Sequence, residues 1–300
     1  MLSHWLRAVR IRFLLASVIS VFLGLVIGWW QNATINLEFA ALTMAGVVAL
    51  HGSVDLLNDY WDYKRNIDTE TKRTKFSGGT GVLPEGLLKP SEVYRAGVIL
   101  LIIGAAIGVY FVFERGITIA IILGFAIISI YFYSTRIVDS GLGEVFVAIK
   151  GAMIVLGTYF VQTSHIMWEP VFAGIFSGIL SSTVLFVNSF PDYDADKSHG
   201  RKTLVILLGK QRAASSAWVF PAITYGIIAI SISLRIFPII SILTFATIPI
   251  AIRSCKSLKQ KFDHVDELVP IMERFVSYSR ITGILLVISF VADYFVRTVQ

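Results

Sequence analysis

Two short segments combine amide and carboxylate side chains at the point where a hydrophobic run ends. Asn58 and Asp62 belong to the first segment. The same residue types recur at the same spacing 130 residues later, as Asn188 and Asp192. Mg²⁺ prefers near-octahedral oxygen coordination and usually takes one or two carboxylates from the protein together with phosphate oxygens from a substrate. The two segments therefore predict two half-sites whose magnesium ions bridge one diphosphate.

The acidic residues of the first segment have a helical spacing. If the chain leading to Asp62 is helical, Asp55, Asp59 and Asp62 share one face, because they are three or four residues apart. Asn58 lies on the same face. Asp and Asn are costly near lipid and are usually kept there for function. The alternative, an ordinary solvated helix end, leaves the repetition of the pattern unexplained.

Basic residues follow both acidic segments directly. Arginine and lysine make strong hydrogen bonds to phosphate oxygens and could neutralise the charge that builds on a diphosphate leaving group. For any one of these residues, a solvated helix end is the alternative. The candidates are Lys64, Arg65, Lys72, Arg73, Arg201 and Lys202.

The composition is that of a membrane protein. Of 300 residues, 55% are hydrophobic and 15% are charged, and the mean hydropathy is +0.73. A soluble domain of this length is much more polar, so we predict an all-α polytopic membrane protein. The net charge of +6 does not indicate a nucleic-acid partner, because the basic residues gather in particular loops. Cys255 is the only cysteine, which excludes an intramolecular disulfide.

Nine apolar runs are long enough to cross a lipid bilayer as helices of roughly twenty residues. The first run lacks an obvious small-residue cleavage site, so we predict a retained helix and not a signal peptide. We expect one domain, 1–300, with the helices around a central cavity and two related halves, 1–135 and 136–300, each with one acidic segment. The predicted spans are about 11–30, 37–57, 93–113, 117–134, 143–163, 169–190, 213–233, 236–253 and 275–296.

The loops differ strongly in charge. Lys and Arg number six in 58–92, five in 191–212 and five in 253–274, whereas the loops of the other parity are short and nearly free of them. The positive-inside rule then places the N-terminus in the cytoplasm and the C-terminus outside. Both acidic segments consequently face the cytoplasm, where soluble diphosphates and Mg²⁺ are found.

Two of these loops have further features. Residues 69–92 are rich in glycine and could fold over a site as a lid, with an ordinary solvent loop as the alternative. Residues 254–274 mix apolar and charged side chains, and we predict an amphipathic segment at the membrane interface.

Polar residues also occur inside the apolar runs. Lys150 lies about 10 Å into the fifth span, at 1.5 Å per residue. It is either a cation that lines the cavity and contacts diphosphate or acceptor, or a residue that snorkels to the interface. Glu144 opens the same span and could pair with a cation, and we expect His51 to be a hydrogen-bonded packing residue.

The paired acidic segments resemble the two aspartate-rich motifs of the UbiA superfamily of intramembrane prenyltransferases, which follow the second and sixth of nine helices. The resemblance covers essentially the whole chain and is closest to the dihydroxynaphthoate, or menaquinone-type, branch. It rests on 58–62 with Asp68, on 188–196, and on the stretches 141–145, 157–163 and 200–204.

Some positions depart from that branch. Asp55 stands where the branch often has Asn, and Lys150-Gly151 where it often has Phe-Gly. His51-Gly52 is similar to animal members that make vitamin K₂. The Asn-Arg-Pro stretch common after the first motif in the hydroxybenzoate and archaeal lipid branches is absent.

The resemblance implies Mg²⁺-dependent transfer of a polyprenyl group from its diphosphate to an aromatic acceptor, 1,4-dihydroxy-2-naphthoate in menaquinone biosynthesis. Geranylgeranyl diphosphate is the candidate donor. The resemblance also implies two metal ions and a multi-pass protein of the cell membrane. The implied metal ligands are Asn58, Asp62, Asp68, Asn188, Asp192 and Asp196. Candidate catalytic or supporting residues are Asp59, Asp68, Asp194, Tyr133 and Lys150. Candidate substrate-binding residues are Arg10, Asn58, Arg65, Lys72, Ser134, Arg136, Lys150, Arg201 and Lys202.

Two alternatives stay open. The acceptor could instead be geranylgeranylglyceryl phosphate, hydroxybenzoate, haem or a chlorin. A secondary transporter is the alternative from another class, since repeats and buried charges also mark transporters. Transporter sites lie near the middle of the membrane, however, and these carboxylates lie at the ends of the spans.

Overall fold

The computed structural model describes residues 1–299, and within them every regular element is a helix. Nine segments are long and apolar enough to cross a membrane in this part of the chain. This confirms the predicted all-α polytopic protein. The spans are formed by α2 (Ile11–Asn32), α3 (Leu37–Lys64), α5 (Pro90–Arg115), α6 (Ile117–Phe132), α7 (Gly143–Thr163), α8 (Trp168–Asn188), α11 and α12 (Lys210–Ser216 and Val219–Ser233), η3 and α13 (Ile239–Thr247 and Ile248–Lys261) and α14 (Val265–Val299).

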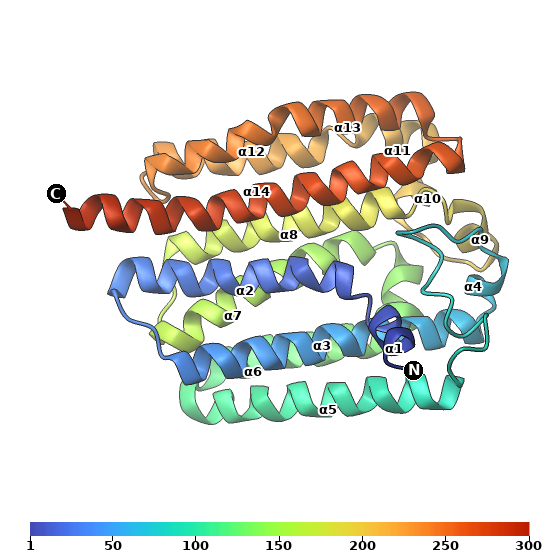
Figure 1. Cartoon of the computed structure of the whole chain (residues 1–300), viewed down its shortest axis with the longest axis horizontal. Coiled ribbons are helices and arrows are strands. Elements are labelled where there is room, and N and C mark those ends of the chain that lie inside the picture. Colours follow the sequence, from blue (N-terminus) through green and yellow to red (C-terminus); the bar gives the residue numbers. More distant parts are fainter. Residues whose placement is uncertain (300) are drawn as a thin grey trace.

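The long helices lie side by side in a bundle (Figure 1). The helices α3, α5 and α6 form one side, α2 and α7 lie in the middle, and α8, α14 and the α12–α13 pair form the other side. The short helices α1 (Leu2–Ala8), α4 (Ile67–Glu70), α9 (Tyr193–Ser198) and α10 (Leu204–Leu208) gather at one end of the bundle, opposite the C-terminus. That end carries both acidic segments.

Glycines let α7 and α8, two helices of the cavity wall, pack closely against each other. A Cβ on Gly178 of α8 would lie 2.1 Å from the carbonyl oxygen of Ala148 in α7, and one on Gly151 would lie 2.7 Å from the Cα of Gly178. Small residues at such crossings let helix backbones approach in membranes. The packing fixes α7 against α8, so Lys150 and Asn188 belong to one rigid wall.

Several helices extend further than the apolar runs that revealed them. The second span continues to Lys64, so the first acidic segment is itself helical. The fourth span ends in a π-helical turn, η1 (Tyr133–Ile137), and a 3₁₀ turn, η2 (Val138–Ser140). Turns of the π type are frequent at functional sites.

The prediction of an interfacial segment over 254–274 is wrong. The helix α13 runs to Lys261 and α14 begins at Val265, which leaves a short turn between them. Leu268 is fully buried and belongs to the main hydrophobic core. The apolar residues that suggested an amphipathic surface segment are the first turns of a packed helix.

Candidate active site

The first acidic segment forms the last two turns of α3. Asn58 and Asp62 are one turn apart, and the Asn58 side-chain amide donates to Asp62 Oδ2 at 2.8 Å. The Ser134 hydroxyl, from the π turn that ends α6, donates to Asn58 Oδ1 at 3.0 Å. The helix therefore places both side chains on the cavity, and the π turn fixes the orientation of one of them.

The second acidic segment follows the C-terminus of α8. Asn188 is the last residue of that helix, and Asp192 precedes α9. Asp192 Oδ2 accepts a hydrogen bond from the Gly78 amide at 3.0 Å. Asp192 Oδ1 and Asn188 Oδ1 are buried and have no hydrogen-bond partner within residues 1–299. Two buried oxygens without donors fit a bound cation.

Arg201 joins the two segments. Its guanidinium forms ion pairs with Asp62 and, at 3.0 Å, with Asp196, and these three side chains are almost completely buried. Buried ion pairs need such geometry to offset the loss of hydration. The two acidic segments, 130 residues apart in sequence, thus meet at one point.

Arg10 approaches from the other side. It lies in a left-handed conformation between α1 and α2, with φ of 43°, and donates to Asp59 Oδ1 at 2.5 Å. The Thr80 hydroxyl donates to the second oxygen of the same carboxylate. Asp59 is buried and does not line the cavity. Arg10 and Thr80 donate hydrogen bonds to its two carboxylate oxygens. Its role in the structure is to orient Arg10.

The loop after α4 covers this end of the cavity. Its residues Phe76 and Ser77 are buried, and they line the cavity with Gly78 and Gly79. Arg7 and Arg73 both pair with Glu85 and hold the loop from outside. The loop is therefore a packed cover, as the lid prediction requires, and not an ordinary solvent loop.

Substitution of Gly79 tests whether the contact between this cover and Asp68 matters for activity. Gly79 has φ of 68°, and a Cβ there would lie 2.1 Å from Asp68 Oδ2. Gly86, in the same loop and with the same φ, would carry a Cβ with no other atom within 4 Å. We expect Gly79→Ala to lower turnover by about 100-fold, because it displaces Asp68, whereas Gly86→Ala carries only the backbone cost of roughly 1–2 kcal/mol.

Turnover and melting temperature should be measured for both variants in detergent. Equal losses of turnover in the two would show that backbone strain, and not the contact with Asp68, limits the enzyme.

Two carboxylates outside the membrane spans, Asp192 and Asp68, have raised pKa values in the protein alone. Burial, together with the nearby Asp196, raises the pKa of Asp192 to about 7. Burial and the charges of Asp62 and Asp59 raise the pKa of Asp68 to about 8. Removing water from a carboxylate disfavours its charged form. A divalent cation would stabilise these groups as anions, so the site fits a metal electrostatically.

The donor set also fits magnesium. Among residues 1–299, no three acidic, histidine or cysteine side chains converge tightly enough to enclose a metal. A site of few protein oxygens suits an ion that completes its shell with water and phosphate. Asn58, Asp62, Asn188 and Asp192 offer such oxygens on the cavity wall.

Both arginines keep a donor for a further anion. The Nε–H groups of Arg10 and Arg201 are buried and have no partner within the described residues. An unpaired buried donor is costly. A diphosphate between the two side chains would satisfy both donors.

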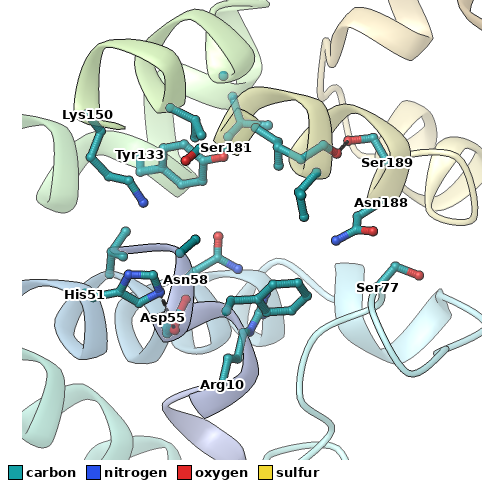
Figure 2. A pocket seen from close by; sticks show the side chains of 18 of the residues that line it. Arg10, His51, Asp55, Asn58, Ser77, Tyr133, Lys150, Ser181, Asn188 and Ser189 are labelled. Carbon is teal, nitrogen blue, oxygen red and sulfur yellow. Dashed lines mark hydrogen bonds and ion pairs between the residues drawn. The ribbon is translucent and has the colours of Figure 1, made fainter. Parts of the chain in front are cut away.

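The cavity below the acidic end has a volume of about 310 Å³ and is walled mostly by apolar side chains of α2, α3, α6, α7 and α8. Figure 2 shows Arg10, Asn58 and Asn188 toward one part of it and Lys150, His51 and Asp55 toward another. Lys150 points into the cavity, and so it does not snorkel to the interface. The cavity can hold an apolar chain beside a polar group.

Most predicted site residues meet here. Ten of them line the cavity: Arg10, Asn58, Asp62, Asp68, Tyr133, Lys150, Asn188, Asp192, Asp196 and Arg201. Ser134 is buried behind Asn58. Arg65 pairs with Asp139 and donates to the Ser134 and His199 carbonyls, so it braces the loops of this end.

Seven predicted residues do not line the cavity: Asp59, Arg65 and Ser134, described above, and four that are exposed. The exposed residues are Lys72, Arg136, Asp194 and Lys202. Lys72 pairs with Asp266, and Asp194 pairs with Lys210. The structure does not bring these four residues to the acidic centre, because each points away from its segment's buried face.

Other lining residues were not among the candidates. Asp55 and His51 are the clearest. Helical spacing had placed Asp55 on the acidic face of α3 without giving it a role, and His51, expected to be a packing residue, lies one helical turn before it. Glu144 pairs with no cation within residues 1–299; its Oε1 accepts from the Leu204 amide at 3.0 Å, at the start of α10. Arg12 and Arg280 also line the cavity, and only the tertiary structure reveals them.

Comparisons with known proteins agree with this arrangement. The sequence model of the UbiA prenyltransferase family matches residues 17–264. The 1,4-dihydroxy-2-naphthoate octaprenyltransferase of Escherichia coli (strain K12) is 24% identical over 298 residues, covering 95% of this chain and 94% of that protein. The protein of the same name from Bacillus subtilis (strain 168) is 26% identical over 287 residues, covering 94% and 90%.

Solved structures share the fold. A UbiA homologue from Archaeoglobus fulgidus, bound to GPP and Mg²⁺, superposes with a TM-score of 0.64 at 17% sequence identity and covers 93% of this chain and 99% of that one.

Proposed function

This chain belongs to the UbiA prenyltransferase family, and we propose that it transfers a polyprenyl group from a polyprenyl diphosphate to 1,4-dihydroxy-2-naphthoate in a Mg²⁺-dependent reaction. The observation that carries the proposal is the ion-paired junction at Arg201, where two acidic segments meet above an apolar cavity. The acceptor is supported by the relatives with that activity in their names, which match nearly the whole chain.

The residues that would hold magnesium are Asn58, Asp62, Asn188 and Asp192, with Asp68 and Asp196 beside them. We propose two ions. Bound Mg²⁺ would neutralise charge on the diphosphate oxygens and so favour departure of the diphosphate.

The arginines act on the same leaving group. As the allylic C–O bond breaks, its electron pair goes to the diphosphate, and Arg10 and Arg201 donate hydrogen bonds to the oxygens where that charge builds. Asp59 holds Arg10 in place for this. The allylic carbon then forms a bond with a ring carbon of the acceptor, and the ring loses a proton.

The walls protect the reaction from water. An allylic cation reacts readily with water, and a closed apolar site prevents that side reaction. The cover at 76–79 closes the acidic end, and apolar side chains of α3, α6 and α7 surround the space below it. The polyprenyl chain, geranylgeranyl in our proposal, lies in that space.

We infer that the acidic end faces the cytoplasm. Six, five and five Lys and Arg residues occur in the three loops at that end, 58–92, 191–212 and 253–274. Cytoplasmic loops carry such an excess. The protein would then draw both Mg²⁺ and its soluble substrates from the cytoplasm, in the cell membrane, with its two halves, 1–135 and 136–300, each supplying one acidic segment.

The proposal is tested with purified protein, geranylgeranyl diphosphate, Mg²⁺ and 1,4-dihydroxy-2-naphthoate. We expect release of diphosphate and formation of a prenylated naphthalene, both abolished by EDTA. Product with hydroxybenzoate, a glycerophosphate lipid, haem or a chlorin instead would correct the acceptor alone. No diphosphate release with any acceptor or chain length would overturn prenyl transfer and favour a transporter.

A further inference from the structure

A second group of polar side chains lies deeper in the cavity than the acidic segments. We call Ser17, His51, Asp55 and Lys150 the deep polar cluster. The Ser17 hydroxyl lies 2.7 Å from His51 Nδ1, and His51 Nε2 lies 3.5 Å from Asp55 Oδ2. All four side chains line the cavity. Asp55 precedes Asn58 by one helical turn, which is about 4.5 Å along α3.

Lys150 reaches this cluster from the opposite wall. In Figure 2 its ammonium group points across the cavity toward His51 and Asp55. No acidic side chain of residues 1–299 lies within 4.0 Å of Lys150 Nζ, and Nζ makes no hydrogen bond to them. A cation within a membrane span is costly unless it is paired. Lys150 thus carries a positive charge that faces the cavity and has no acidic partner within the described residues.

Asp55 offers the complementary acceptor. Its Oδ2 is buried and accepts no hydrogen bond within the described residues. His51 is held by Ser17 on one ring nitrogen and directs the other toward Asp55. The cluster therefore offers an anion-binding group on α7 and a hydrogen-bond acceptor on α3, on opposite walls of one space.

These two features fit the acceptor and not the donor. A polyprenyl chain has no polar group for either wall, and its diphosphate has Arg10 and Arg201 at the acidic end. An aromatic acid has a carboxylate and a ring hydroxyl on a flat apolar body. Such a molecule would satisfy Lys150 and Asp55 together, one turn below the place where the diphosphate leaves.

We propose that Lys150 binds the carboxylate of an aromatic acid acceptor while Asp55, oriented by His51, accepts a hydrogen bond from a ring hydroxyl. This inference rests on the proposed function and names the specificity residues of its acceptor side.

The test compares two ligands that differ by the carboxylate. Binding of 1-hydroxy-2-naphthoate and of 1-naphthol to the purified full-length protein is measured by quenching of intrinsic fluorescence, which needs no turnover. We expect Lys150→Met to weaken binding of the acid by about 10- to 100-fold, the worth of a charged hydrogen bond. Binding of 1-naphthol should change by less than about threefold.

A second variant and a second ligand separate recognition from folding. Lys150→Arg keeps the cation and should restore most of the affinity for the acid, and binding of geranyl diphosphate with Mg²⁺ should be unchanged in both variants. Equal weakening of acid and naphthol by Lys150→Met, or wild-type affinity for the acid, would overturn the proposal.

Failure of this inference can be distinguished from failure of the proposed function. Turnover of the naphthoate by Lys150→Met at the wild-type KM would reject the role of Lys150 and leave prenyl transfer intact. Lys150-dependent binding of the acid, in a wild-type protein that does not prenylate the naphthoate, would support the binding site and reject only that acceptor.

Discussion

Asp192→Asn should lower the rate of prenyl transfer by about 100- to 1,000-fold, which is the usual cost of removing one group that stabilises charge at the reacting centre. Asn has nearly the same shape, so the Gly78 amide can still donate to its side-chain oxygen. The negative charge is lost, and with it the affinity for Mg²⁺ of the pair formed by Asp192 and Asn188. The measurement is diphosphate release as a function of Mg²⁺ concentration.

The control lies two residues further on. Asp194 has a side chain that is 83% exposed and pairs with Lys210. We expect Asp194→Asn to keep the wild-type rate within about twofold, because surface pairs are worth little. A large loss in this variant would restore the sequence-based prediction that Asp194 supports catalysis, and it would mean that α9 moves when substrate binds.

The fold could be predicted almost completely from the sequence. Only helices and closed barrels can span lipid, so the nine apolar runs correspond directly to the nine spans found in residues 1–299. The ends of the helices were less predictable. The helix α3 continues past its apolar run to Lys64 because Asp59 and Asp62 find partners in the protein, and hydropathy does not register such partners.

The acidic centre was also predictable, since spacing alone paired Asn58 with Asp62 and Asn188 with Asp192. Spacing could not separate the inward cations from the outward ones. Arg201 and Lys202 are neighbours in sequence, yet one is buried between two carboxylates and the other is exposed. The deep polar cluster was not predicted as a unit. Lys150 was expected to line the cavity and Asp55 to share the acidic face of its helix, but Ser17, His51 and Lys150 come from three helices whose packing only the structure shows.

Arg201 and Lys202 also provide the strongest test of the acidic centre. Arg201→Lys keeps one positive charge but not the fork that reaches Asp62 and Asp196 at once, and a lysine is a poor substitute at such bidentate sites. We expect the turnover number to fall by about 1,000-fold, comparable to the loss of an arginine that stabilises a phosphoryl transition state. The two carboxylates would repel each other once the fork is gone, so the half-sites would separate.

Lys202→Met is the matched control, since its side chain is exposed and lies outside the cavity. It should retain turnover within about twofold, because it removes a solvated charge and no buried contact. Melting temperatures of both variants, measured with and without Mg²⁺ and geranyl diphosphate, show whether Arg201→Lys is folded and whether ligand still stabilises it. A folded Arg201→Lys variant with normal turnover would mean that the acidic segments meet without the guanidinium, since the bound metal and diphosphate would then be sufficient to hold Asp62 and Asp196 together.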